Sequence, residues 1–232
     1  MMMFDPMYLL FIAPGLILSL WASFRVKRAF NKYSKVRSMR GLTGAEAAEE
    51  MLRYAGIGDV RIVRAHGMLS DHYNPLNKTL NLSESVYDSN SIAAIGVATH
   101  EAGHAIQHAR NYAPLWVRSA LVPTANIGSG IGYFVMVIGL WMASTNMVLV
   151  GAMLFSAVLL FQVVTLPVEF NASNRAKALV LENGIITREE RPGMDAVLNA
   201  AALTYVAAAI STLLTLLYFL MRAGLLGGRS RD

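Results

Sequence analysis

The sequence contains four long apolar runs that have no charged side chain. They cover residues 6–24, 119–146, 147–168 and 196–221, and the second and third runs form one uncharged block of 50 residues. About 20 helical residues cross the roughly 30 Å of hydrocarbon in a bilayer, so each run is long enough for one membrane helix. The uncharged block would make a single helix about 75 Å long at ~1.5 Å per residue. We therefore expect two helices there, joined by a tight turn at residues 144–146.

Residues 41–113, between the first two runs, have the patterns of short helices and strands that predict a small α+β unit. Thr-Gly-Ala-Glu at residues 43–46 is a capping box that opens an amphipathic helix. Residues 60–65 and 78–82 roughly alternate apolar and polar side chains, which predicts two short strands. The second of these strands is an edge-strand candidate, able to pair with a substrate backbone. A helix capped by a serine is expected at residues 91–109.

Composition supports a membrane protein. Apolar residues make up 55% of the chain and charged residues only 15%, with a mean hydropathy of +0.43. A soluble domain typically carries about 25% charged residues, and a disordered chain is poor in apolar ones, so intrinsic disorder is excluded. Cysteine is absent. This excludes disulfides and thiolate metal sites, so a bound metal would depend on His, Asp or Glu.

The basic residues predict how the chain is oriented in the membrane. Residues 25–40 contain seven Lys or Arg and no acid, directly after the first apolar run. Basic loops stay in the cytoplasm, so we expect the N-terminus outside, residues 25–118 inside, and the first run to be a retained anchor. The tail residues Arg222, Arg229 and Arg231 weigh slightly against this orientation. Anionic lipid headgroups explain the basic cluster better than nucleic acid does.

The candidate chemistry lies in the sequence His100-Glu101-Ala102-Gly103-His104. Histidines at positions i and i+4 of a helix lie on one face, one turn apart, so both imidazoles can reach one metal ion. Glu101 lies on the adjacent face, where it can take a proton from a metal-bound water without binding the metal. The alternative is a fortuitous pair of histidines on a polar helix face, which the rarity of the five-residue pattern disfavours.

A catalytic zinc usually has three protein ligands, so a third ligand must be found. His108 lies two turns from His100, about 12 Å along the helix axis, which is too far for one ion. The metzincin pattern is excluded because Gln107 and Arg110 occupy the positions of its glycine and third histidine. The remaining candidates in the expected cytoplasmic segments are His66, His72, Glu169, Glu182, Glu189 and Glu190.

Glu169 is the strongest of these candidates. It follows Pro167, which suits the first turn of a helix, at the end of the third apolar run. A carboxylate at a membrane boundary is costly unless it is solvated or paired, and a zinc ion would pair it. The competing interpretation is a solvated glutamate at the interface. Glu182 instead precedes Asn-Gly, a helix stop, and Glu189 and Glu190 lie in a charged loop.

Five longer blocks carry a resemblance to a known family. They read MFDPMYLL, FNKYSKV, DHYNPLNKTLNLSESVY, ATHEAGHAIQHA and LPVEFNASNRA. The blocks resemble the YugP-type membrane zinc metallopeptidases of bacteria, the neutral zinc metallopeptidase 2 family, and more distantly the HtpX and CAAX prenyl-endopeptidase gluzincins. The resemblance implies one Zn²⁺ per chain on His100, His104 and Glu169, with Glu101 as general base, in the bacterial inner membrane. Ser173 stands where the distant group usually has an aspartate.

These patterns together predict an α-helical multi-pass membrane protein, with about four transmembrane helices and a small α+β zincin-like cytoplasmic domain. The expected parts are an anchor (1–24), the cytoplasmic zincin-like part (25–113), a membrane hairpin (114–168), a cytoplasmic helical segment (169–195), and a membrane helix with its tail (196–232). We expect a zinc endopeptidase that hydrolyses membrane or membrane-proximal proteins at the cytoplasmic face. The alternatives are a non-catalytic membrane scaffold clamped by zinc, and a zinc hydrolase of other substrates. Candidates for stabilising the oxyanion are His72, Tyr73, His108, Asn174 and Arg175.

Overall fold

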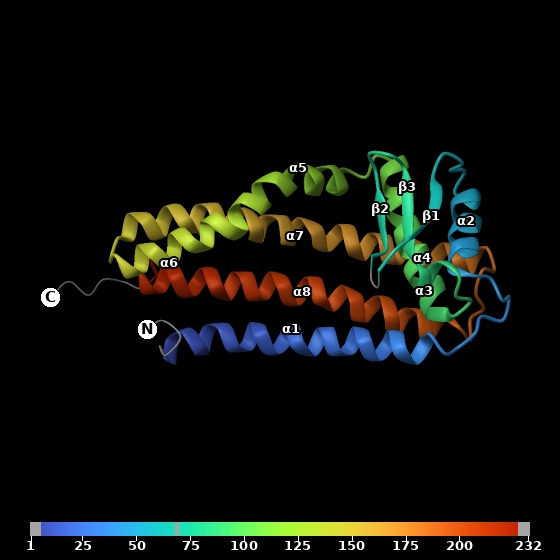
Figure 1. Cartoon of the computed structure of the whole chain (residues 1–232), viewed down its shortest axis with the longest axis horizontal. Coiled ribbons are helices and arrows are strands. Elements are labelled where there is room, and N and C mark those ends of the chain that lie inside the picture. Colours follow the sequence, from blue (N-terminus) through green and yellow to red (C-terminus); the bar gives the residue numbers. More distant parts are fainter. Residues whose placement is uncertain (1–5, 68–69, 227–232) are drawn as a thin grey trace. The chain divides into compact units, whose positions relative to one another are not determined.

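A computed structural model describes residues 6–67 and 70–226 of the chain (Figure 1). The first five residues of the expected anchor and the tail residues Arg229 and Arg231 lie outside these ranges. In chain order the elements are α1 (Pro6–Tyr33), α2 (Gly44–Tyr54), β1 (Arg61–Ala65), β2 (His72–Asn74), β3 (Thr79–Ser83), α3 (Glu84–Tyr87), α4 (Ile92–Ala109), α5 (Ala113–Ile127), the π-helix η2 (Gly128–Gly132), α6 (Tyr133–Trp141), α7 (Thr145–Glu182) and α8 (Arg191–Arg222).

The chain divides into two compact units, each built from segments that are distant in sequence. The sheet unit consists of Ser23–Leu115 and Pro167–Leu203. The helical unit consists of the described residues before Ser23, Trp116–Leu166, and the described residues from Thr204 onward. The segment that contains Glu169 therefore belongs to the same unit as the HExxH helix, although the hairpin separates the two in sequence.

Four helices in the described ranges are long and apolar enough to cross a membrane. They are Pro6–Tyr33, Ala113–Trp141, Thr145–Glu182 and Arg191–Arg222, the second combining α5, η2 and α6. Between 11% and 33% of the most apolar stretch of each helix is buried inside the protein. Apolar side chains that remain exposed on this scale are stable in hydrocarbon and not in water. The four predicted membrane helices are confirmed as elements, and each is longer than its uncharged run.

The helical unit contains a hairpin as predicted, but its turn lies at residues 142–144 and not at 144–146, because α6 ends at Trp141 and α7 begins at Thr145. Glycines allow its two arms to approach closely. A Cβ added at Gly128 would collide with a backbone carbonyl of α7, and one added at Gly132 would lie 2.8 Å from the backbone nitrogen of Phe155. Glycines spaced four residues apart are typical of such close contacts between membrane helices.

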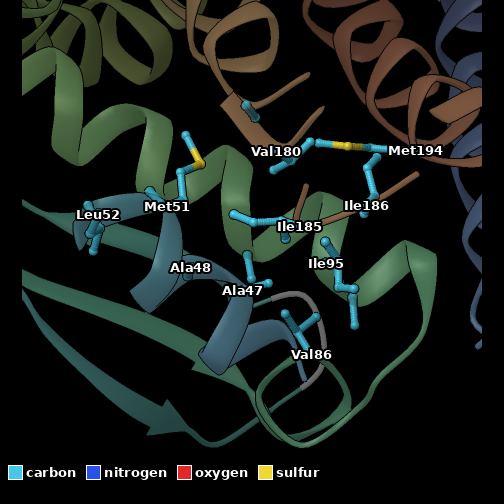
Figure 2. Close-up of a cluster of buried hydrophobic side chains, with 14 of the residues drawn as sticks. Ala47, Ala48, Met51, Leu52, Val86, Ile95, Val180, Ile185, Ile186 and Met194 are labelled. Carbon is cyan, nitrogen blue, oxygen red and sulfur yellow. The ribbon is translucent and has the colours of Figure 1, made fainter. Parts of the chain in front are cut away.

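The core of the sheet unit lies between α2, α4 and the parts of α7 and α8 that belong to this unit (Figure 2). Met51, Ile95 and Val180 are among its fully buried side chains. The predicted capping box at the start of α2 is confirmed. The Thr43 hydroxyl accepts a hydrogen bond from the Glu46 N–H, and the Glu46 carboxylate accepts one from the Thr43 N–H.

The three strands form one mixed sheet in the order β1-β3-β2, in which β1 is parallel and β2 antiparallel to β3. The strands predicted at 60–65 and 78–82 are confirmed within one residue as β1 and β3. The prediction that the second is an edge strand is wrong, because β3 lies between the other two. The outer strands are β1 and β2, and β2, which has three residues, two of them polar, is too short to show an alternating pattern.

Pro167 lies inside α7 and does not begin a helix, contrary to the prediction. A proline in a helix interior removes one backbone hydrogen bond and crowds the preceding turn. The helix continues because a stripe of side chains after the proline is buried. Val168, Ala172, Ala176 and Val180 recur every four residues, and each is fully buried. The third apolar run and Glu169 therefore lie on one continuous helix.

Candidate metal centre

Helix α4 presents the two histidines of the HExxH motif. It begins after Ser91, whose hydroxyl accepts a hydrogen bond from a backbone N–H of the first turn, as predicted. Ile95 and Ile106 are fully buried and fix one face of the helix in the core. The imidazoles of His100 and His104 lie together, with ring centroids 4.8 Å apart.

Gly103 allows α4 to lie directly against α7. A Cβ added at Gly103 would lie 2.7 Å from the carbonyl oxygen of Ala172, so any side chain there would force the two helices apart. Ala172 lies about one turn after Glu169 on α7. The close approach of the two backbones therefore brings the Glu169 carboxylate, which is 2% exposed, within reach of both imidazoles.

His100, His104 and Glu169 form a group whose geometry fits a metal ion. One possible ligand atom from each residue lies within 4.8 Å of the other two. Glu169 Oε2 is 3.3 Å from His100 Nε2 and 3.6 Å from His104 Nε2. Two ligand atoms that are each about 2.0–2.2 Å from one tetrahedral zinc ion lie roughly 3.3–3.6 Å apart. The donor atoms, and the spacing of the Glu169 carboxylate from each histidine, are therefore those expected of a zinc site.

The second ring nitrogen of each histidine has its own partner. His100 Nδ1 lies 3.0 Å from Ser173 Oγ, and His104 Nδ1 lies 3.0 Å from Gln107 Oε1. Partners of this kind hold the ring of a metal-binding histidine and leave the other nitrogen to face the metal. Ser173, on α7, thus contacts a histidine of the group.

Burial and neighbouring carboxylates shift the pKa of His104 in opposite directions. Burial of the imidazole lowers its pKa, but the contact with Glu169 and the negative charge of Glu101 outweigh burial and raise the pKa above its ordinary value. The carboxylates therefore favour positive charge at this point of the sheet unit. A metal cation bound by the group would be stabilised by the same field.

Glu101 is not a member of the group of three and instead contacts the edge strand. Its Oε2 accepts a hydrogen bond of 3.1 Å from the backbone N–H of Tyr73 in β2. The Tyr73 hydroxyl lies 2.8 Å from His108 Nδ1, and burial raises the pKa of this hydroxyl. Two of the five oxyanion candidates, Tyr73 and His108, are therefore in contact with each other next to the Glu101 contact.

The other candidates for the third ligand lie outside the group. His66, His72, Glu182 and Glu189 are exposed. Glu190 accepts hydrogen bonds from the backbone N–H groups at positions 39 and 187, which occupies both of its carboxylate oxygens. Among the described residues, Glu169 is thus the acid that the fold brings to the two histidines.

Gln107 is a residue of the site that the sequence pattern alone did not indicate. It is fully buried, and its amide contacts both His104 and α7. Its spacing of three residues from His104 places it on the same face of α4, and this was the available signal. The backbone contact from Tyr73 to Glu101 had no such signal, because it joins an unpredicted strand to the helix.

The fold and this group of residues define a class, namely helical membrane proteins with a largely buried His-His-Glu group that fits zinc. A family model described as "Putative neutral zinc metallopeptidase" matches residues 8–224. The chain is also 48% identical over 204 residues to the "Putative membrane protease YugP" of Bacillus subtilis (strain 168), which covers 88% of this chain and 91% of that protein. The chain therefore belongs to this family of membrane zinc metallopeptidases, as the sequence resemblance implied. No solved structure is significantly similar to it.

Proposed function

We propose that the protein is a zinc-dependent endopeptidase of the gluzincin type, which hydrolyses membrane or membrane-proximal proteins. The observation that carries this proposal is the group of His100, His104 and Glu169, in which the carboxylate lies from each histidine Nε2 at the spacing of tetrahedral zinc ligands. One zinc ion per chain, held by these residues, would polarise the scissile carbonyl and lower the pKa of a bound water.

Glu101 is the proposed proton carrier of the reaction. The hydrogen bond from the Tyr73 backbone N–H holds one of its carboxylate oxygens and so orients the group. The other oxygen then takes the proton of the attacking water, as a general base does. The same carboxyl group delivers this proton to the leaving amine, as a general acid does.

The edge strand β2 is the proposed binding site for the substrate backbone. It is an outer strand of the sheet, and Glu101 lies against it through the hydrogen bond from the Tyr73 N–H. An extended peptide can add to such an edge through main-chain hydrogen bonds. A substrate on this edge would have a peptide bond next to Glu101. β2 thus takes the role that the sequence pattern suggested for the strand at 78–82.

A zinc-clamped scaffold is the less well supported alternative. A structural zinc site normally closes with a fourth protein side chain, whereas the group found in the described residues has three members. An acid placed between the two histidines in sequence also has no role in a clamp. The name of the Bacillus relative, a membrane protease, favours a peptide substrate over the other zinc-hydrolase alternative.

We further propose that residues 25–113 and 169–195 form a zincin-like domain in the cytoplasm, and that 1–24, 114–168 and 196–232 are the membrane parts. The seven basic residues that follow the first apolar run support this orientation. Glu169 directly follows an apolar run on the same helix, which favours cleavage close to the membrane surface.

Single cysteines introduced into this cysteine-free chain test the orientation. Leu76, in the β2–β3 turn, is 95% exposed, and Thr145 is exposed at the start of α7. In intact cells, a membrane-impermeant thiol reagent should label Thr145→Cys, and it should spare Leu76→Cys until the cells are permeabilised. Labelling of Leu76→Cys in intact cells would place the sheet unit on the outer side of the membrane.

Comparison of membrane proteomes tests the proposed function. Cells with Glu101→Gln should accumulate one or more uncleaved membrane proteins and lose the matching fragments, because the variant keeps the fold but lacks the proton carrier. Cells that lack the whole chain are the control. An endopeptidase predicts that both strains show the same uncleaved proteins. A scaffold predicts that Glu101→Gln cells resemble the wild type and that only deletion of the chain has an effect.

A further inference from the structure

Gln107 has a fully buried amide whose polar atoms all lie against partners. It lies on α4, three residues after His104. Its amide nitrogen is 2.8 Å from the carbonyl oxygen of Val168 and 3.0 Å from Asn171 Oδ1, and its Oε1 is 3.0 Å from His104 Nδ1. A buried amide is costly unless its hydrogen bonds are made. This amide makes them to His104, a proposed ligand, and to α7, the helix that carries Glu169.

The contacts with α7 determine which way the amide points. The Val168 carbonyl oxygen can only accept a hydrogen bond. Asn171 Oδ1 also accepts a hydrogen bond of 2.7 Å from Arg175 Nε, a pure donor, so this atom is the oxygen of the Asn171 amide. Gln107 must therefore turn its NH₂ group toward α7 and its oxygen toward His104. A reversed amide would place oxygen against oxygen twice.

The direction of the amide determines the tautomer of His104. Because Gln107 Oε1 can only accept, His104 Nδ1 must carry a hydrogen. In the neutral imidazole the lone pair then lies on Nε2, which is the atom 3.6 Å from the Glu169 carboxylate. We infer that Gln107 is a positioning residue, which selects the Nδ1–H tautomer of His104 and so presents the Nε2 lone pair to the metal. That this lone pair binds zinc rests on the proposed function.

The same amide connects the histidine helix to the helix of the proposed third ligand. Val168 and Asn171, its two partners on α7, lie on either side of Glu169 in sequence. The oxygen of the amide therefore orients His104, while its nitrogen sets the position of α7 at Glu169. The Gln107 side chain therefore contacts His104 directly and contacts α7 on either side of Glu169.

His100 is not constrained in this way and supplies a matched comparison. Its Nδ1 faces the Ser173 hydroxyl at 3.0 Å, and a hydroxyl can either donate or accept a hydrogen bond. Ser173→Ala therefore removes a partner of a histidine Nδ1 without removing a group that selects a tautomer. Gln107→Met removes the acceptor at His104 with little change in side-chain length.

Nuclear magnetic resonance can read the tautomer directly in the metal-free, full-length protein, because the chain has only five histidines. With ¹⁵N-histidine label in detergent micelles, the pH is raised until His104, whose pKa the carboxylates raise, is neutral, and long-range ¹H–¹⁵N spectra then separate its protonated nitrogen from its lone-pair nitrogen. The His104 signals are those missing from His104→Ala. We expect the Nδ1–H tautomer in the wild type and a shift toward Nε2–H in Gln107→Met. A wild-type His104 in the Nε2–H tautomer would overturn the inference, even if Gln107→Met does not fold.

Zinc affinity, measured by competition with a chromophoric chelator, gives a second readout that does not depend on activity. Gln107→Met should bind zinc about 10–100-fold more weakly than the wild type, as is typical when the outer partner of a ligand is lost. Ser173→Ala should lose less. Equal affinity of Gln107→Met and the wild type would overturn the inference but leave the zinc site in place. An equal loss in Ser173→Ala would also remove tautomer selection as the cause. A wild type that binds no zinc would instead overturn the proposed function, and the tautomer measurement would still decide the inference.

Discussion

Replacement of Glu169 by alanine should remove zinc from the purified protein and abolish proteolysis. The carboxylate is buried, and its Oε2 lies 3.3 Å from His100 Nε2 and 3.6 Å from His104 Nε2. Without it two histidines remain, fewer than the three protein ligands that a catalytic zinc site usually has. Metal analysis of the purified variant, together with cleavage of an unfolded protein substrate, measures both losses.

Two matched variants control for general damage to the fold. Glu182→Ala removes an exposed acid from the end of the same helix, and His108→Ala removes a histidine four residues beyond His104 on α4. Both proteins should retain as much zinc as the wild type. Zinc retained in Glu169→Ala, with zinc lost in either control, would assign the third ligand to a different residue and refute the proposed site.

Replacement of Glu101 by glutamine should leave zinc binding intact and strongly reduce turnover. The glutamine amide has nearly the shape of the carboxylate, and its oxygen can still accept the hydrogen bond from the Tyr73 N–H. The amide cannot take a proton from water, however. General acid–base catalysis typically contributes about 10²- to 10⁴-fold to the rate, which sets the minimum loss that we expect.

Initial rates and zinc content of Glu101→Gln should be measured on the same preparation, because only the pair of results separates the possible roles. Low activity with wild-type zinc content is the result expected of a general base. Full activity would contradict the mechanism. Loss of zinc would mean that Glu101 binds the metal or supports the site structurally.

Local patterns made part of the fold predictable. Uncharged runs long enough for the bilayer predicted the membrane helices, because hydrocarbon tolerates few charges over that length. Ser91 and the capping box at 43–46 predicted the starts of α4 and α2, because a cap depends on residues within one turn. The i and i+4 spacing predicted that His100 and His104 share a face, and their rings lie together in the structure.

Contacts between distant segments account for what the sequence did not predict. The three residues of β2 are strand because they pair with β3, and not because of their own pattern. Pro167 remains helical because the stripe that begins at Val168 is buried against other elements. The partners of the Gln107 amide on α7 lie 61 and 64 residues away in sequence. No periodicity within one element reports contacts of this kind.

The hairpin of α5–α7 separates His104 from Glu169 in sequence, so the ribosome makes the proposed zinc ligands at different times. On the ribosome, His104 is made 65 residues before Glu169, a delay of about 3–13 s at ~5–20 residues per second. Glu169 also follows the second arm of the hairpin on the same helix, so the proposed set of ligands is incomplete until both arms of the hairpin have been made. A nascent chain that ends within the hairpin would lack the third proposed ligand, and the proposed protease would be inactive until synthesis has passed this helix.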